Sequence, residues 1–310
     1  MRDCIVVFDT NSYRYLAREI PDKQILDLNK IEKKNSITSL GSHYVAFELI
    51  SHLSDKTDPH FENCYQALNL LYKHIKYDKN LHFIANAEAI LCKLLYKELP
   101  PYTDEVNHRL VNLIYKIISD KNNLQDKIIH KEVSRIEQEL NEIEERFLDE
   151  LRRSIIKRIK PNSEKWNSIK EDSDLRKRAL TFLNSKNQDY YTAYSNVIKA
   201  ANALEIRESY LETHKKVLWV KSIFKVQLEF YRLILKKIWI DGANADKGSR
   251  RNWIWDLHII LCLGNNLLFN EKEVYLITSD GEILEAASNA GADKYVLKLE
   301  EYLTACGFYT

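Results

Sequence analysis

The stretch that decides the fold lies near the start of the chain and reads Cys4-Ile5-Val6-Val7-Phe8-Asp9-Thr10-Asn11. Its apolar half is short, continuous and rich in β-branched residues, a pattern typical of a strand that is buried on both faces. A helical pattern follows from Ser12 to Ala17. Asp9 is therefore predicted at the carboxyl end of a strand and beside the start of a helix, where open α/β sheets gather their ligand sites.

A matching stretch lies near the other end of the chain and reads Val274-Tyr275-Leu276-Ile277-Thr278-Ser279-Asp280. It is again a buried strand that leads to an acid, and an alanine-rich helix is expected from Glu282 to Ala290. If both strands belong to one parallel sheet, Asp9 and Asp280 converge at the same edge. Further short strands are predicted at residues 37–40 and 294–297.

Two more acids lie inside predicted helices that are otherwise apolar. Glu48 is flanked by Phe47 and Leu49 in a helix predicted over residues 43–53. Asp256 is surrounded by tryptophan, leucine and isoleucine residues in a helix predicted over residues 252–263. Because an unpaired buried charge is costly, such acids need a partner. A hard divalent cation bound by oxygen ligands, Mg²⁺ or Mn²⁺ rather than Zn²⁺, would provide one.

The region between these ends is predicted to be helical. Apolar residues recur every three or four positions from Ile129 to Ile159, among many charged residues, which indicates one long amphipathic helix that ends before Pro161. We expect a discontinuous core formed by residues 1–55 and 240–310, with a large all-helical insertion at 56–239.

Composition narrows the class of protein. The 46 Lys and Arg residues balance 45 Asp and Glu residues, so any nucleic-acid surface must be local. The five cysteines form no C-x-x-C pair and are predicted to be reduced core residues, which favours a cytoplasmic protein, and no apolar run is long enough to span a membrane. The chain also contains no H-E-x-x-H motif, P-loop, G-x-G-x-x-G motif or G-x-S-x-G elbow.

Taken together, these motifs resemble the PIN-domain family. The resemblance is carried, in the order that the family shows, by the strand ending in Asp9-Thr10-Asn11, by Glu48 in its helix, by Asp256, and by Thr278-Ser279-Asp280. It implies a three-layer α/β/α nuclease core with a short parallel sheet that hydrolyses phosphodiester bonds with Mg²⁺ or Mn²⁺. The resemblance also implies that RNA is the preferred substrate.

The resemblance also implies roles for individual residues. Asp9, Glu48, Asp256 and Asp280 would be the catalytic metal ligands, and Thr10 or Asn11 and Thr278 or Ser279 would orient them. Asn252 would share a helix face with Asp256, and Lys247, Arg250 and Arg251 form a basic segment suited to a nucleic-acid backbone. A toxin or defence role with an inhibitor or companion protein is implied by the resemblance alone.

Other interpretations of the same residues remain open. Asp9 and Asp280 are also expected as ordinary helix caps, Glu48 as a solvated helix residue, and Asp256 as the partner of Arg250 or Arg251 in a structural ion pair. A noncatalytic helical scaffold that binds a protein partner is one alternative function. A Mg²⁺-dependent phosphatase-like hydrolase is another, although Asn11 occupies the position where those enzymes carry a second aspartate.

Overall fold

A computed structural model describes the chain except for residues 20–21, 78–79, 159–171, 244–251, 265–270 and 309–310. It is a mixed α/β structure in which 72% of the described residues are helical, built around a five-stranded parallel sheet. The strand order is β5-β2-β1-β6-β7. Its members are β1 (Ile5–Phe8), β2 (Thr38–Ser42), β5 (Phe83–Ile84), β6 (Val274–Ile277) and β7 (Val296–Leu297).

The central position of β1 follows from its composition. All four of its residues are buried, as expected for a parallel strand covered on both faces. Ile5 lies opposite Thr38 of β2 and Val274 of β6, so the first strand joins segments from both ends of the chain. The expected strands near the two termini are thus confirmed, and so is their membership in one parallel sheet.

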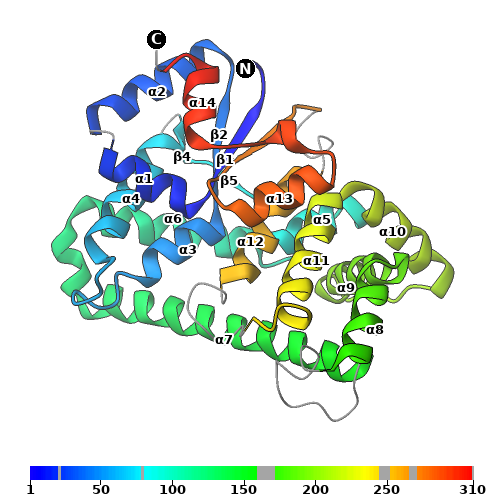
Figure 1. Cartoon of the computed structure of the whole chain (residues 1–310). Helices are drawn as coiled ribbons and strands as arrows, with labels where there is room; N and C mark the ends of the chain where they lie inside the picture. The colour runs from blue at the N-terminus through cyan, green and yellow to red at the C-terminus, as the bar shows by residue number, and fades with distance from the viewer. Residues whose placement is uncertain (20–21, 78–79, 159–171, 244–251, 265–270, 309–310) are drawn as a thin grey trace.

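The helices described in the first hundred residues are α1 (Thr10–Glu19), α2 (Asp22–Lys34), α3 (His43–Ser51), α4 (Phe61–His74) and α5 (Ala87–Tyr96). Among them, α2 and α3 contact strand β2, and α5 packs on α9 (Lys186–Ala203). Helix α4 packs on α1, α2 and α3. Figure 1 shows both termini at the same end of the molecule, beside α2 and α14 (Leu299–Cys306).

The other helices in the described part of the chain contain more residues than the first five. They are α6 (Thr103–Ser119), α7 (Lys127–Arg158), α8 (Ser173–Leu183), α9 (Lys186–Ala203), α10 (Tyr210–Ile223), α11 (Lys225–Trp239), α12 (Trp253–Ile259) and α13 (Gly281–Asn289), with short 3-10 turns at Lys121–Gln125, Ile260–Gly264 and Asp293–Tyr295. The long helix predicted from periodicity is α7, which packs against α3 and runs along the side of the molecule opposite the termini (Figure 1). Pro161 lies outside the described residues.

The expectation of an all-helical insertion is wrong in one respect. The described part of residues 56–239 contains three two-residue strands, β3 (Lys76–Tyr77), β4 (Asn80–Leu81) and β5. Of these, β5 extends the main sheet by pairing with β2. Strands of two residues are too short to produce the alternation of apolar and polar residues by which a strand is recognised in a sequence.

The hydrophobic core does not separate the two regions. One continuous cluster of buried side chains includes Phe8 of β1, Leu71 of α4, Val197 of α9, Trp239 of α11 and Leu303 of α14. All five cysteines are buried and free, as predicted. Within the described residues, every helix is too short or too polar to cross a membrane.

Candidate functional site

The register of β1 and β6 brings the two terminal acids together. Phe8 lies opposite Ile277, and the next backbone amide, Asp9 N, donates to the Ile277 carbonyl at 3.0 Å. Asp9 and Thr278 therefore leave the carboxyl edge of the sheet side by side. The Thr278 hydroxyl donates to Asp9 Oδ2 at 2.6 Å and accepts from the amide of Asp280 at 3.0 Å.

Both strand-end aspartates also cap helices. Asp9 Oδ1 accepts from the Ser12 amide at 2.6 Å, and Asp280 Oδ1 accepts from the amides of Glu282 and Ile283 at 2.7 and 3.0 Å. The capping interpretation is thus correct for one oxygen of each carboxylate. The second oxygen of Asp280 makes no hydrogen bond to a described residue, so capping leaves it available for another ligand.

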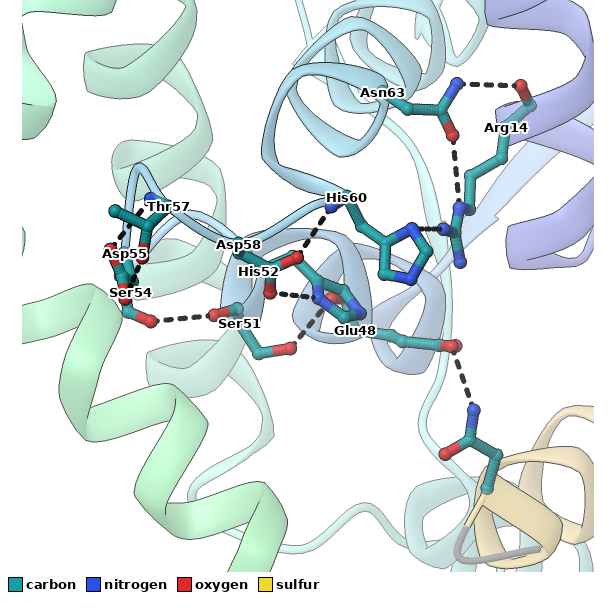
Figure 2. Close-up of polar contacts among 11 residues, drawn as sticks. Arg14, Glu48, Ser51, His52, Ser54, Asp55, Thr57, Asp58, His60 and Asn63 are labelled. Atoms are coloured by element: carbon teal, nitrogen blue, oxygen red, sulfur yellow. Dashed lines mark hydrogen bonds and ion pairs between the residues drawn. The ribbon is translucent and has the colours of Figure 1, made fainter. Parts of the chain in front are cut away.

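Glu48 reaches the same place from α3. Its Oε2 accepts from the Thr10 hydroxyl at 2.6 Å, and its Oε1 accepts from Asn252 Nδ2 at 3.4 Å. These two contacts join α3 to the beginning of α1 and to the residue that precedes α12. Figure 2 shows the Glu48 carboxylate extended away from His52 and Asp58, which bond to each other at 2.8 Å.

Asp256 differs from the other three acids. It lies on α12 and is partly exposed, as Glu48 and Asp280 are, but its side chain makes no hydrogen bond or ion pair with a described residue. The proposed ion-pair partners Arg250 and Arg251, together with Lys247, lie outside the described residues. Asp256 is the least satisfied carboxylate of the group, and an added cation would change its environment most.

All four acids line one cavity of about 230 Å³. Residues from both chain ends and from α3 form its walls: Asp9, Thr10, Asn11, Arg14, Tyr44, Val45, Glu48, Asn252, Trp255, Asp256, Ile259 and Asp280. We call this the acid cavity. The structure therefore brings together all four predicted ligands, although more than 200 residues separate Glu48 from Asp256 in the sequence.

Electrostatics in the acid cavity disfavour ionised carboxylates. Burial raises the pKa of Asp9 and of Glu48, while the hydrogen bonds from Ser12, Thr278 and Thr10 partly offset that rise. Burial raises the pKa of Asp256 well above its ordinary value, and the nearby charges of Asp280, Glu48 and Asp9 raise it further. Without a cation, protons would neutralise part of this group.

The donor set fits a hard cation in composition, because it consists of carboxylate oxygens with amide and hydroxyl neighbours. The positions of these side chains do not yet match the geometry of a metal site. Across the part of the chain that the structure describes, no group of three or more His, Cys, Asp or Glu side chains could hold a metal ion as it stands. Binding would therefore require side-chain movement, for which Asp256 and the free oxygen of Asp280 have the fewest competing contacts.

The residues predicted to orient the acids divide into two groups. Thr10 and Thr278 donate to Glu48 and Asp9, respectively, and Asn252 donates to Glu48. Asn11 is exposed at the cavity without a hydrogen bond to an acid, and Ser279 is exposed outside the cavity lining. The roles assigned to these residues in catalysis stay predictions.

Arg14 is a cavity residue that the sequence analysis missed. Its Nε donates to Asn63 Oδ1 at 3.1 Å, its Nη2 bonds to His60 Nδ1 at 2.7 Å, and Asn63 donates back to the Arg14 carbonyl at 3.2 Å (Figure 2). The remaining terminal nitrogen, Nη1, has no such partner among the described residues. Its signal was the four-residue spacing from Thr10, which places both on one helix face.

Comparison with protein-family models, curated proteins and solved structures finds no match to this chain. The site must therefore be interpreted from its own geometry and chemistry.

Proposed function

We propose that the protein is a metal-dependent endonuclease with a PIN-like core that hydrolyses phosphodiester bonds, preferentially in RNA. One observation carries the proposal: Asp9, Glu48, Asp256 and Asp280 line a single cavity at the carboxyl edge of a parallel sheet. The acids come from four separate segments, and three of them have pKa values raised by burial. Helix capping accounts for one oxygen each of Asp9 and Asp280, but it gives no reason for Glu48 and Asp256 to lie beside them.

The proposal assigns a role to most of the polar residues that line the acid cavity. Asp9, Glu48, Asp256 and Asp280 would hold one or two Mg²⁺ or Mn²⁺ ions, which when bound supply a polarised water and offset charge on phosphate oxygens. Thr10 and Thr278 hold Glu48 and Asp9 in place. Arg14 lines the cavity and would act there as a cationic donor for a phosphate oxygen.

The test is cleavage of structured and single-stranded RNA and DNA with Mg²⁺, Mn²⁺ or EDTA. We expect cutting that requires the metal and falls by at least about 100-fold in Asp9→Asn and Asp280→Asn, because each replaces a charged ligand. Asp172→Asn is the matched control, since Asp172 caps α8 through the amides of Asp174 and Leu175 but lies outside the acid cavity.

The control separates capping from catalysis. If Asp172→Asn and Asp280→Asn lower cutting equally, Asp280 acts only as a cap. A wild-type protein that neither cuts nor binds Mn²⁺ would refute the nuclease and favour the noncatalytic scaffold. Release of phosphate from small monoesters, without cutting of any nucleic acid, would instead favour the phosphatase-like hydrolase.

A further inference from the structure

A second and larger cavity adjoins the acid cavity. Its volume is about 640 Å³, within the range of about 300–1,000 Å³ that ligand sites occupy. Side chains from α3, α5, α7, α9, α11 and α12 line it, and Tyr44 and Trp255 line both cavities. These two rings therefore form the boundary between the acid cavity and the second cavity, which we call the aromatic cavity.

The boundary is a fixed aromatic surface. The Tyr44 ring contacts both Trp255 and His258, with ring centroids 5.9 and 4.8 Å away and planes tilted by 31° and 37°, and the Trp255 and His258 centroids are 6.2 Å apart. Trp255 Nε1 donates to Glu144 at 2.9 Å, and the Tyr44 hydroxyl accepts from the Ala87 amide at 3.0 Å. Both rings are thus oriented before any ligand arrives, which reduces the entropy lost on binding.

A buried pair of amides forms another part of the lining. Asn196 and Gln227 are 7% and 5% exposed, and Asn196 Nδ2 donates to Gln227 Oε1 at 2.8 Å. The other amide oxygen and nitrogen make no hydrogen bond to a described residue. If both amides are flipped, the pair still presents one donor and one acceptor, so this property does not depend on their assignment.

The charges around the aromatic cavity balance. Arg153 and Lys199 contribute two cations to the lining, and Glu88 and Glu150 contribute two anions. A lining of this kind favours a planar, uncharged, polar ligand over a phosphate group.

We propose that the aromatic cavity binds one unpaired nucleobase of an RNA strand whose neighbouring phosphate occupies the acid cavity. This inference rests on the proposed nuclease function and deepens it, because it names single-stranded RNA as the substrate. A nucleobase is flat, uncharged, and bears donors and acceptors along its edge, which match an aromatic wall and an amide pair. The shared wall of Tyr44 and Trp255 places the base directly beside the acids.

The experiment measures binding of dye-labelled RNA octamers in EDTA, where metal-dependent cutting does not occur. The probes are A, C, G and U homopolymers and an octamer of abasic ribose phosphate. We expect the abasic chain to bind about 10-fold more weakly than the tightest homopolymer, since stacking contributes about 1–3 kcal/mol per base. Equal affinity for abasic and base-bearing chains would overturn the proposal.

Two tyrosines on α9 give a matched pair of variants. Tyr191 lines the aromatic cavity and is 48% exposed, whereas Tyr194 is 40% exposed and lies outside its lining. We expect Tyr191→Ala to weaken binding of base-bearing RNA about fivefold or more, from lost stacking, with no change for the abasic chain. Tyr194→Ala is expected to match the wild type, and equal losses in both variants would overturn the assignment.

The amide pair is tested by Gln227→Glu, which replaces the amide nitrogen with an acceptor. We expect the order of affinity among the four homopolymers to change, and thermal unfolding checks that the variant folds. An unchanged order in a folded variant overturns the base-reading role of the pair. Base-dependent binding without any metal-dependent cutting would contradict the nuclease function alone, whereas cutting with equal affinity for the abasic chain would contradict the base cavity alone.

Discussion

Thr278 provides the sharpest test of the acid cavity, because one buried hydroxyl connects two of its carboxylate residues. Thr278 is fully buried, donates to Asp9 Oδ2 at 2.6 Å, and accepts from the Asp280 amide at 3.0 Å. Thr278→Val removes both hydrogen bonds with little change of shape. A bond to a charged group contributes about 1.5–3 kcal/mol and a neutral one about 1 kcal/mol, so we expect a loss of about 2–4 kcal/mol at pH 8.

The loss should depend on pH in a defined direction. Burial raises the pKa of Asp9, so ionising Asp9 destabilises the folded protein at high pH, and this penalty disappears as pH falls through the folded-state pKa. The Thr278 bond reduces the penalty by favouring the charged form. The difference in unfolding free energy between wild type and Thr278→Val should therefore be larger at pH 8 than at pH 5.

Urea unfolding followed by circular dichroism at the two pH values measures this difference. Thr103→Val is the control, because the buried Thr103 hydroxyl donates at 2.8 Å to an uncharged acceptor, the Pro100 carbonyl. We expect that variant to lose about 1 kcal/mol at both pH values. The reasoning is refuted if the two variants show the same pH dependence, or if Thr278→Val loses less than about 0.5 kcal/mol at pH 8.

Three further predictions concern the cation, the core and the sheet. Mn²⁺ at 100 times its Kd should add about 2.7 kcal/mol to the free energy of unfolding and raise Tm by about 4 °C. Asp256→Asn should raise Tm in the absence of Mn²⁺ but reduce the Tm shift that Mn²⁺ causes. Equal Mn²⁺-induced Tm shifts for the variant and the wild type in a thermal scan would contradict the ligand role of Asp256. Glu32 is fully buried and hydrogen-bonds to His74 at 2.9 Å. Glu32→Ala should therefore lower the free energy of unfolding, measured in urea, by about 3–5 kcal/mol. A decrease below about 1 kcal/mol would show that the Glu32–His74 pair does not contribute to folding. A Cβ on Gly41 would lie 2.6 Å from Ile75 Cδ1 and 2.9 Å from the Phe83 ring, so Gly41→Ala should lower the free energy of unfolding by about 1–3 kcal/mol. Unchanged stability would mean that the Ile75 side chain and β5 both adjust freely.

The sequence determined the local elements that carry the acids. Asp9 follows β1 and Asp280 follows β6 because uninterrupted apolar runs of β-branched and aliphatic residues can be recognised without knowledge of the fold, and the even spacing of apolar residues in α7 is equally local. Glu48 stood out because it interrupts an apolar helix, a contrast that needs only its neighbours in the chain. These features made the four-acid group predictable.

Only the tertiary structure decided how these elements meet. The pairing of Phe8 with Ile277 sets Thr278 against Asp9, the fold of α1 brings Arg14 to the cavity, and β5 joins the sheet although its two residues carry no strand pattern. The aromatic cavity needs side chains from six helices, among them Tyr44 and Gln227, which are more than 180 positions apart. Periodicity reports the face of one element, whereas register and cavities arise from packing between elements that the chain brings together from a distance.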